Sequence, residues 1–379
     1  MAVSELSHFE SRVWGCLLGG TVGDAIGKAT HRLSRDEIQS RFGYVTGLID
    51  TIAPPCNVNP SAPVVSAASW RSMPEEPVPV PGGQYTDVTR LKHLLCDAMI
   101  FFGGHVGAYE VSKYWLEHMN PFDYYYPVFA SFFKLYFDAA PPRDNGIGNI
   151  PSNSSAMAIA PVGLINPAQP RNAALEAFDV ASLVHTGYAR DAACLVAAGV
   201  AACLAPDATT ESVVEAAREA VHPDQVLCEA MDKALEVAEE ATSEEDLIER
   251  LYGSALWPLI RREANPLDPG YMPTADPREA VPCAFAMYSF AGGDPTRALL
   301  CAANFGRDAL AIGSIVGSLA GALSGVEAIP DDWRQRVEGA NPRTDLNLVR
   351  GLIAIVERDI AFSAQRAQFL QSMGLGSAR

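Results

Sequence analysis

The spacing of apolar and polar positions along this 379-residue chain is that of helices almost throughout. Residues 190–205 are small and apolar on nearly every face, which predicts a buried helix. Residues 210–220 and 227–252 are apolar on one face and acidic on the other, which predicts two amphipathic helices, and a final one is expected over 348–373. Alternating β-branched runs with Asn-Gly turns are nearly absent. We therefore expect an all-α protein with a compact, multi-helix fold.

Two further stretches depart from an ordinary amphipathic pattern. Residues 308–326 repeat Gly and Ser every three or four positions; at that spacing the small residues share one helix face, so a neighbouring helix can approach closely. Residues 53–83 contain many prolines, which forbid a continuous helix. No linker separates two cores, so we expect a single domain over 1–379 with a proline-rich loop insertion at 53–83.

Composition excludes several partners. The 45 acidic residues outnumber 28 Lys and Arg, for a net charge of −17, which argues against nucleic acid or an anionic membrane surface as a partner. A small anionic ligand in a local basic pocket stays open. The apolar runs are too interrupted to span a membrane, and the N-terminus lacks a signal-peptide pattern. Eight cysteines without zinc spacing are typical of buried thiols in a reducing cytoplasm. The oligomeric state cannot be inferred.

Four short stretches stand out because small polar residues interrupt apolar helix text. They are GCLLGGTVGDAIG at 15–27, GQYTDVT at 83–89, SNSSAMAIAPVG at 152–163, and NFGRDALA at 304–311, which runs on to GVEAIP at 325–330. In order and spacing they resemble the motifs of the ADP-ribosylglycohydrolase superfamily, which includes the dinitrogenase reductase-activating glycohydrolase. The resemblance extends from Gly15 to about Trp333, with a looser match at SLVH, residues 182–185.

The resemblance implies an all-α fold with two divalent cations, magnesium or manganese, in a central cleft. The family's ligands are the Thr and two Asp of a T-D-D motif, together with the two Asp and last Thr of D-T-D-T. The cations orient the ribose of an ADP-ribosyl group, and a nearby carboxylate helps to activate water. The products are ADP-ribose and the freed acceptor.

This sequence departs from the family at the cation ligands. Three positions match: Thr86, Asp87 and Asp308. Three others carry aliphatic side chains instead: Val88, Leu310 and Ala311. Hard cations need several oxygen ligands, so we expect neither metal ligands nor a resident cofactor. A single, weakly held Mg²⁺ or Mn²⁺ on Asp87 and Asp308 is the alternative.

Two further differences change the expected chemistry. His31 stands where the family commonly has a catalytic Glu, and an imidazole with a reference pKa of about 6.5 can act as a base; the alternative is a loop histidine without chemistry. Arg307 replaces a Gly, where it would pair with Asp308 or bind an anionic substrate group. For Asp87 and Asp308 a purely structural role, capping helices or pairing with Arg307, is also open.

Three functions are compatible with this pattern. The favoured one is a metal-independent glycoside hydrolase acting on an N-ribosyl or ADP-ribosyl, nucleotide-like small molecule, because a carboxylate stabilises the oxocarbenium-like transition state of such cleavage. The candidate catalytic residues are Asp24, His31, Asp87, Asp308 and His185. The candidate substrate-binding residues are Thr86, Asn153, Ser154, Ser155, Met157 and Arg307. The alternatives are a non-catalytic ligand-binding or structural member of the fold, and a conventional Mg/Mn-dependent ADP-ribosyl-protein hydrolase.

Overall fold

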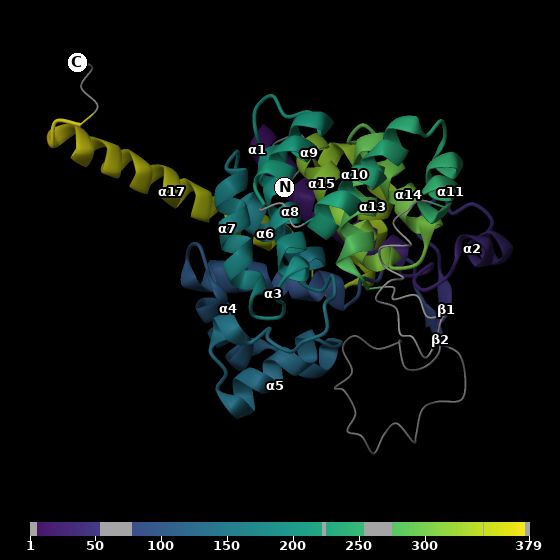
Figure 1. The fold of residues 1–379 in the computed structure, drawn as a ribbon, viewed down its shortest axis with the longest axis horizontal. Helices are drawn as coiled ribbons and strands as arrows, with labels where there is room; N and C mark the ends of the chain where they lie inside the picture. The colour runs from purple at the N-terminus through teal and green to yellow at the C-terminus, as the bar shows by residue number, and fades with distance from the viewer. Residues whose placement is uncertain (1–5, 54–77, 222–224, 254–274, 344, 376–379) are drawn as a thin grey trace.

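The computed structural model describes residues 6–53, 78–221, 225–253, 275–343 and 345–375, and shows helices stacked around a central pair (Figure 1). The helices are α1 (His8–Gly27), α2 (Arg35–Phe42), α3 (Asp87–Phe102), α4 (Ala108–His118), α5 (Val128–Asp138), α6 (Ala160–Leu164), α7 (Pro170–Ala181), α8 (Tyr188–Cys203), α9 (Thr210–Glu219), α10 (Gln225–Glu240), α11 (Glu244–Gly253), α13 (Pro277–Phe290), α14 (Pro295–Phe305), α15 (Ala309–Ser324), α16 (Asp331–Ala340) and α17 (Leu346–Ser372). Short 3-10 turns lie at Pro121–Asp123, Pro142–Asp144, Ala156–Ala158 and Val326–Ala328. The predicted all-α fold is confirmed. Within the described ranges, no helix combines the length and apolarity that a membrane crossing needs.

One small β-ribbon interrupts the helices. Strand β1 (Thr51–Ala53) pairs antiparallel with β2 (Val78–Val80), with Thr51 opposite Val80 and Ala53 opposite Val78. The two strands therefore bracket most of the predicted proline-rich insertion. Residues 54–77 of that insertion lie outside the described residues.

Helices α1 and α15 form the centre of the molecule and lie with their backbones in contact. Glycines recur every four residues on both, so that Gly19 faces Gly317 and Gly23 faces Gly313 in antiparallel order. A Cβ added to Gly19 would collide with the carbonyl oxygen of Gly317, and the reverse holds as well. The close helix approach predicted for 308–326 is thus confirmed, and its partner is the first motif.

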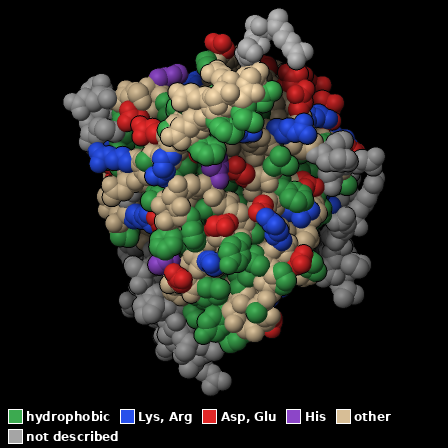
Figure 2. Space-filling model, turned by 90° about the vertical axis from the view of Figure 1, so that its left-hand side faces the viewer, with side chains coloured by type: hydrophobic (Ala, Val, Ile, Leu, Met, Phe, Trp, Pro, Cys, Tyr) green, Lys and Arg blue, Asp and Glu red, His purple; other side chains and the backbone are tan. Residues whose placement is uncertain are grey.

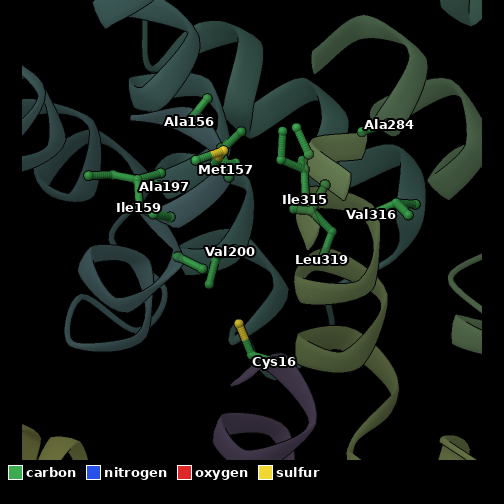
Figure 3. Close-up of a cluster of buried hydrophobic side chains, with 14 of the residues drawn as sticks. Cys16, Ala156, Met157, Ile159, Ala197, Val200, Ala284, Ile315, Val316 and Leu319 are labelled. Atoms are coloured by element: carbon green, nitrogen blue, oxygen red, sulfur yellow. The ribbon is translucent and has the colours of Figure 1, made fainter. Parts of the chain in front are cut away.

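The apolar core surrounds this pair. In Figure 3, Cys16 of α1, Val200 of α8 and Ile315 and Leu319 of α15 lie around one buried cluster. The predicted buried helix at 190–205 is α8, whose residues from Ala192 to Cys203 are all buried. The seven cysteines in the described ranges are buried and free of disulfides.

The predicted amphipathic helix over 227–252 is wrong in one respect, because the chain forms two helices there. Helix α10 ends at Glu240 and α11 begins at Glu244. Ser243 Oγ accepts the N–H of Asp246, while the Asp246 carboxylate accepts the N–H of Thr242. These side-chain bonds cap the start of a new helix, which the apolar period alone did not reveal. The helix expected at 210–220 is α9.

The last predicted helix, 348–373, is observed as α17, and a buried polar network anchors its start. The Asp345 carboxylate accepts from His93 Nε2 at 2.6 Å and from Thr21 Oγ1 at 3.1 Å. The fully buried Lys92 ammonium donates to Thr21 and to the carbonyl of Leu17. Burial alone would raise the pKa of Asp345, but His93 and Lys92 hold it below its ordinary value. The network thus ties α17 to α1 and α3.

Candidate functional site

Asp24, near the end of α1, fixes the start of α3. Its fully buried carboxylate accepts the N–H and hydroxyl of Thr86 at 2.8 and 2.7 Å, and those of Thr89 at 3.1 and 2.7 Å. Four hydrogen bonds account for the acceptor capacity of one carboxylate. Asp24, predicted as a catalytic candidate, therefore positions the T-D-V-T segment. Thr86, predicted to contact substrate, donates its hydroxyl hydrogen bond to Asp24.

The loop after α1 is clasped to the start of α15. The N–H of Arg32 donates to the carbonyl of Arg307 at 2.7 Å, and the N–H of Arg307 donates to Leu33 at 2.8 Å. Gly306 permits this approach, because it has φ +72° and a Cβ there would meet the Leu33 carbonyl. These two backbone hydrogen bonds bring His31 next to Asp308, although the two residues are 277 positions apart in the chain.

His31, Asp308 and Asn153 form one polar cluster. Nδ1 of His31 lies 3.4 Å from Oδ1 of Asp308, and Asn153 Nδ2 donates to Oδ2 of Asp308 at 2.7 Å. Asp308 and Asn153 are buried, whereas His31 keeps about a quarter of its side chain exposed. Burial lowers the pKa of His31, although the charge of Asp308 opposes this. The cluster therefore presents a neutral imidazole beside an oriented carboxylate at neutral pH.

Asp87 is a second titratable candidate, and the groups that act on it are Asp24 and Arg90. It is the first residue of α3, next to Thr86, and its side chain is partly buried. Burial and the neighbouring charge of Asp24 raise the pKa of Asp87 to about 7, with Arg90 acting in the opposite direction. A carboxyl with this pKa exists in both protonation states near neutral pH and can donate a proton.

Arg307 pairs with a residue that the sequence did not bring to attention. Its guanidinium donates to both oxygens of buried Glu279, from Nε at 2.6 Å and from Nη2 at 2.8 Å. The predicted alternatives were Asp308 or a substrate anion; the observed carboxylate partner is Glu279 at the start of α13. The run Asp276-Pro-Arg-Glu signals a helix start, but nothing in it indicates a partner in the turn between α14 and α15. Burial raises the pKa of Glu279, with Arg307 opposing.

His185 lies deeper than the predicted proton-transfer role suggested. Its side chain is 1% exposed, and burial lowers its pKa to about 3, so the ring is neutral at physiological pH. Nε2 lies 3.3 Å from the hydroxyl of Ser152, which is 2.8 Å from that of Ser154. The described contacts thus join His185 and Ser154 to each other through Ser152, rather than to Asp308.

Ser155 and Met157, both predicted to contact substrate, are buried. Ser155 lines a small pocket of about 30 Å³ whose other walls are apolar, including Leu95 and Trp115. Its hydroxyl has no hydrogen-bond partner among the described residues. Met157 belongs to the core cluster of Figure 3, and its carbonyl accepts from Ser314.

Two cations lie beside the acidic groups of α1 and α3. Lys28, which ends α1, donates to Oε1 of Gln84 at 2.8 Å. Burial lowers the pKa of Lys28, and although Asp24 opposes this, the charge of Arg90 lowers it further. The motifs therefore bring together a half-buried ammonium and a guanidinium.

A surface pocket of about 560 Å³ lies away from these groups. His105, Arg143, Phe178 and Arg190 are among its lining residues, and none of the predicted site residues lines it. Asp87 begins α3 and His105 follows its end, and a helix of 16 residues is about 24 Å long. The pocket is therefore at the opposite end of α3 from the motif cluster.

The residues present do not fit the two cations that the family resemblance implies. Val88 is buried, Leu310 partly so and Ala311 buried, and none of the three offers an oxygen. Thr86 already bonds to Asp24, and Asp308 is already bonded to Asn153. Among the described residues, no group of three or more His, Cys, Asp or Glu side chains is arranged to hold a metal ion.

Comparison with known proteins places this geometry in a family. The family model for ADP-ribosylglycohydrolase matches residues 5–361. The uncharacterized protein YegU of Escherichia coli (strain K12) is 24% identical over 350 residues, covering 87% of this chain and 92% of that protein. An uncharacterized protein of Archaeoglobus fulgidus is 24% identical over 351 residues, covering 88% and 93%. A solved structure described as an ADP-ribosylglycohydrolase-related protein complex superimposes with a TM-score of 0.57 at 18% identity, covering 93% of this chain and 99% of the other, and so shares the fold. The chain belongs to the ADP-ribosylglycohydrolase family.

Proposed function

We propose that this protein is a metal-independent glycoside hydrolase that cleaves the N-ribosyl bond of an ADP-ribosyl or similar nucleotide-like small molecule. The observation that carries the proposal is the cluster of His31, Asp308 and Asn153, in place of a complete set of oxygen ligands. Family membership supports the glycohydrolase class. We infer that catalysis needs no metal ion because Val88, Leu310 and Ala311 stand at the family's ligand positions.

His31 is proposed as the general base. Asp308, held by Asn153, lies next to Nδ1 and favours the tautomer that carries its proton there, which leaves Nε2 free to accept a proton from water. The distance of 3.4 Å is longer than a hydrogen bond, and such contacts commonly shorten when substrate binds. Asp308 then stabilises the imidazolium that forms, as the carboxylate of a catalytic triad does.

Asp87 is proposed as the general acid. Environments that push two titratable groups apart mark the acid and the base: here the pKa of Asp87 is raised to about 7 and that of His31 is lowered. As the bond between C1′ and the leaving nitrogen breaks, its electron pair passes to that nitrogen. A guanidine leaving group then takes the Asp87 proton, whereas nicotinamide leaves as a neutral base without one. The water oxygen bonds to C1′ and its proton passes to His31.

Lys28 and Arg90 are proposed to bind the anionic part of the substrate. Their charges are close enough for Arg90 to lower the pKa of Lys28. Two like charges in proximity are stabilised by an anion between them, and a diphosphate supplies one. This local basic pair supports an anionic ligand in a chain whose net charge is −17.

The test is the pH dependence of turnover in variants. Purified protein is incubated in EDTA with nicotinamide riboside, NAD and ADP-ribosyl-arginine, and released ribose or ADP-ribose is measured. We expect kcat/KM to fall below the pKa of His31, where the base is protonated. For ADP-ribosyl-arginine, whose leaving group takes a proton, we also expect a fall above about pH 7, where Asp87 is ionised; nicotinamide riboside and NAD, which release a neutral base, should lack that second fall. His31→Gln should lower kcat/KM by about 100-fold or more and remove its fall at acid pH. Asp87→Asn should remove the fall of kcat/KM at alkaline pH.

The control is His118→Gln, which changes a histidine that is 42% exposed on its side chain and lies outside the motifs. It should leave turnover and the pH profile unchanged. An unaltered profile in His31→Gln would exclude His31 as the base. Binding of these compounds without turnover in the wild type would instead favour the alternative of a non-catalytic ligand-binding protein, which the aliphatic replacements at ligand positions also allow.

A further inference from the structure

Two strained turns meet beside the proposed catalytic cluster. Of the four non-glycine residues with positive φ in the described ranges, two are Arg32, with φ +64°, and Arg307, with φ +52°. A side chain disfavours this conformation, so it persists only where neighbouring contacts hold it. The N–H of Arg32 donates to the carbonyl of Arg307 at 2.7 Å, which joins the two turns. His31 precedes the first turn and Asp308 follows the second, so their approach depends on both.

Glu279, near the start of α13, holds the turn at Arg307. Its carboxylate accepts from Nε of Arg307 at 2.6 Å and from Nη2 at 2.8 Å, a bidentate contact that fixes both the place and the direction of the guanidinium. The guanidinium is attached to the strained backbone, so fixing one restrains the other. Building on the proposed function, we propose that Glu279 is a positioning residue of the reaction, which through Arg307 holds Asp308 at His31.

Burial gives this pair more weight than the exposed charges of the molecule have. On the face that Figure 2 shows, acidic and basic side chains lie interspersed at the surface, where water screens their attraction. The side chains of Glu279 and Arg307 are 1% and 10% exposed. Loss of the Glu279 carboxylate therefore removes a charge that solvent cannot replace. A change at Glu279 should displace Arg307, and the turn with it.

The start of α13 also supports the other partner of Asp308. The backbone N–H of Asn153 donates to the carbonyl of Ala275 at 3.0 Å, and its side chain donates to Asp308 at 2.7 Å. Ala275 is four residues before Glu279, just ahead of the first residue of the helix. One helix end therefore anchors the residues on both sides of the Asp308 carboxylate, although it contributes no side chain to the cluster itself.

Substitution by glycine distinguishes this role from a contact between the Arg307 side chain and substrate. Glycine adopts positive φ readily because it has no Cβ, whereas methionine does not. Two double variants remove the same two charges: Glu279→Met with Arg307→Gly, and Glu279→Met with Arg307→Met. Only the glycine variant should keep the turn without the ion pair. If the Arg307 side chain instead bound substrate, neither variant would recover turnover.

The first measurement is hydrogen exchange at the N–H groups of Arg32 and Arg307 in the full chain, followed by NMR. It is made at pH 8, above the pKa of about 7 that burial gives Glu279. We expect Glu279→Gln to speed exchange at both groups by about tenfold or more, and the glycine double variant to exchange more slowly than the methionine one. Unchanged exchange in Glu279→Gln, or equal exchange in the two double variants, would overturn the proposal whether or not the protein cleaves any ribosyl compound.

The second measurement is turnover of nicotinamide riboside and NAD in EDTA. Glu279→Gln should lower kcat by about 10- to 100-fold, the cost of displacing a catalytic group by about 1 Å. KM for NAD should change little, because the proposed anion ligands lie at the end of α1 and on α3. The glycine double variant should recover most of kcat and the methionine one should not. A wild-type kcat in Glu279→Gln would overturn the positioning role.

The matched control is Asp97→Asn, which breaks a bidentate ion pair outside the motifs. Arg343 Nη1 donates to Oδ2 of Asp97 at 2.6 Å, and this carboxylate is 22% exposed. The variant should unfold more easily than the wild type but keep its kcat and its exchange at Arg32 and Arg307. A wild type that cleaves neither compound would refute the proposed function, and the exchange measurement would still decide whether Glu279 holds the turn.

Discussion

Replacing Gly19 with valine is expected to lower the free energy of unfolding by about 3 kcal/mol or more, the upper part of the range for overpacked cores. The position faces the carbonyl group of Gly317, and the colliding atoms belong to backbone rather than to a flexible side chain. The helix pair at the centre must therefore separate, which disturbs every element packed on α1 and α15. Urea unfolding followed by circular dichroism should show a lower midpoint, and Gly19→Ala should show a smaller shift in the same direction.

Gly339→Ala is the matched control for this experiment. Gly339 is an exposed residue within helix α16, and a Cβ there meets open space. Alanine is favoured over glycine in a helix by about 1 kcal/mol, so this variant should be neutral or more stable. If Gly19→Val unfolds at the wild-type midpoint, the backbone contact between α1 and α15 is not the packing constraint that the structure indicates.

Asp345→Asn is expected to lower the free energy of unfolding by about 3–5 kcal/mol, as removal of one partner from a buried ionic network does. The substitution keeps the shape but removes the negative charge beside His93 and the buried Lys92. The folded-state pKa of Asp345 lies below its ordinary value, so its stabilisation is present above about pH 4 and is lost as pH falls further. The difference in the free energy of unfolding between wild type and variant, measured by urea unfolding, should therefore become smaller below about pH 4.

Two further variants separate charge from packing in this network. Asp207→Asn changes an exposed aspartate and should stay within about 0.5 kcal/mol of the wild type. The double variant Asp345→Asn with Lys92→Met also removes the buried ammonium, and should recover much of the loss because an apolar side chain of similar length needs no counter-charge. Equal stability of Asp345→Asn and the wild type at pH 7 would show that the network does not hold α17.

Local periodicity predicted the helical stretches at 190–205, 210–220, 308–326 and 348–373, because each buries an apolar or small-residue face that repeats every three to four residues. It failed where a polar cap interrupts a continuous pattern, as at Thr242 and Ser243 between α10 and α11. It also did not distinguish the two halves of α17, because apolar residues continue past Val356, the last buried residue, into the exposed residues from 360 onward. Which face of a helix has a neighbour is a tertiary property that a one-dimensional pattern does not contain.

The motifs named residues that the fold brings together, but not the contacts between them. Asp24 and Thr86 were both nominated, yet their hydrogen bond and the role of Asp24 at the start of α3 depend on how α1 meets α3. Glu279 was not predicted as a site residue because its partner, Arg307, is 28 residues away in the chain, in the turn between α14 and α15. The sequence shows that residue 279 is a glutamate, but its burial and its pairing with Arg307 depend on how the helices pack.

The dependence of turnover on a divalent cation tests the central claim most directly. Protein freed of metal with EDTA is compared with the same protein given Mg²⁺ or Mn²⁺, on the N-ribosyl compound that it cleaves fastest. We predict equal initial rates, because Val88, Leu310 and Ala311 leave too few oxygen ligands, and in the proposed mechanism His31 with Asp308 activates water instead. Turnover that stops in EDTA and returns with added Mg²⁺ or Mn²⁺ would contradict the account.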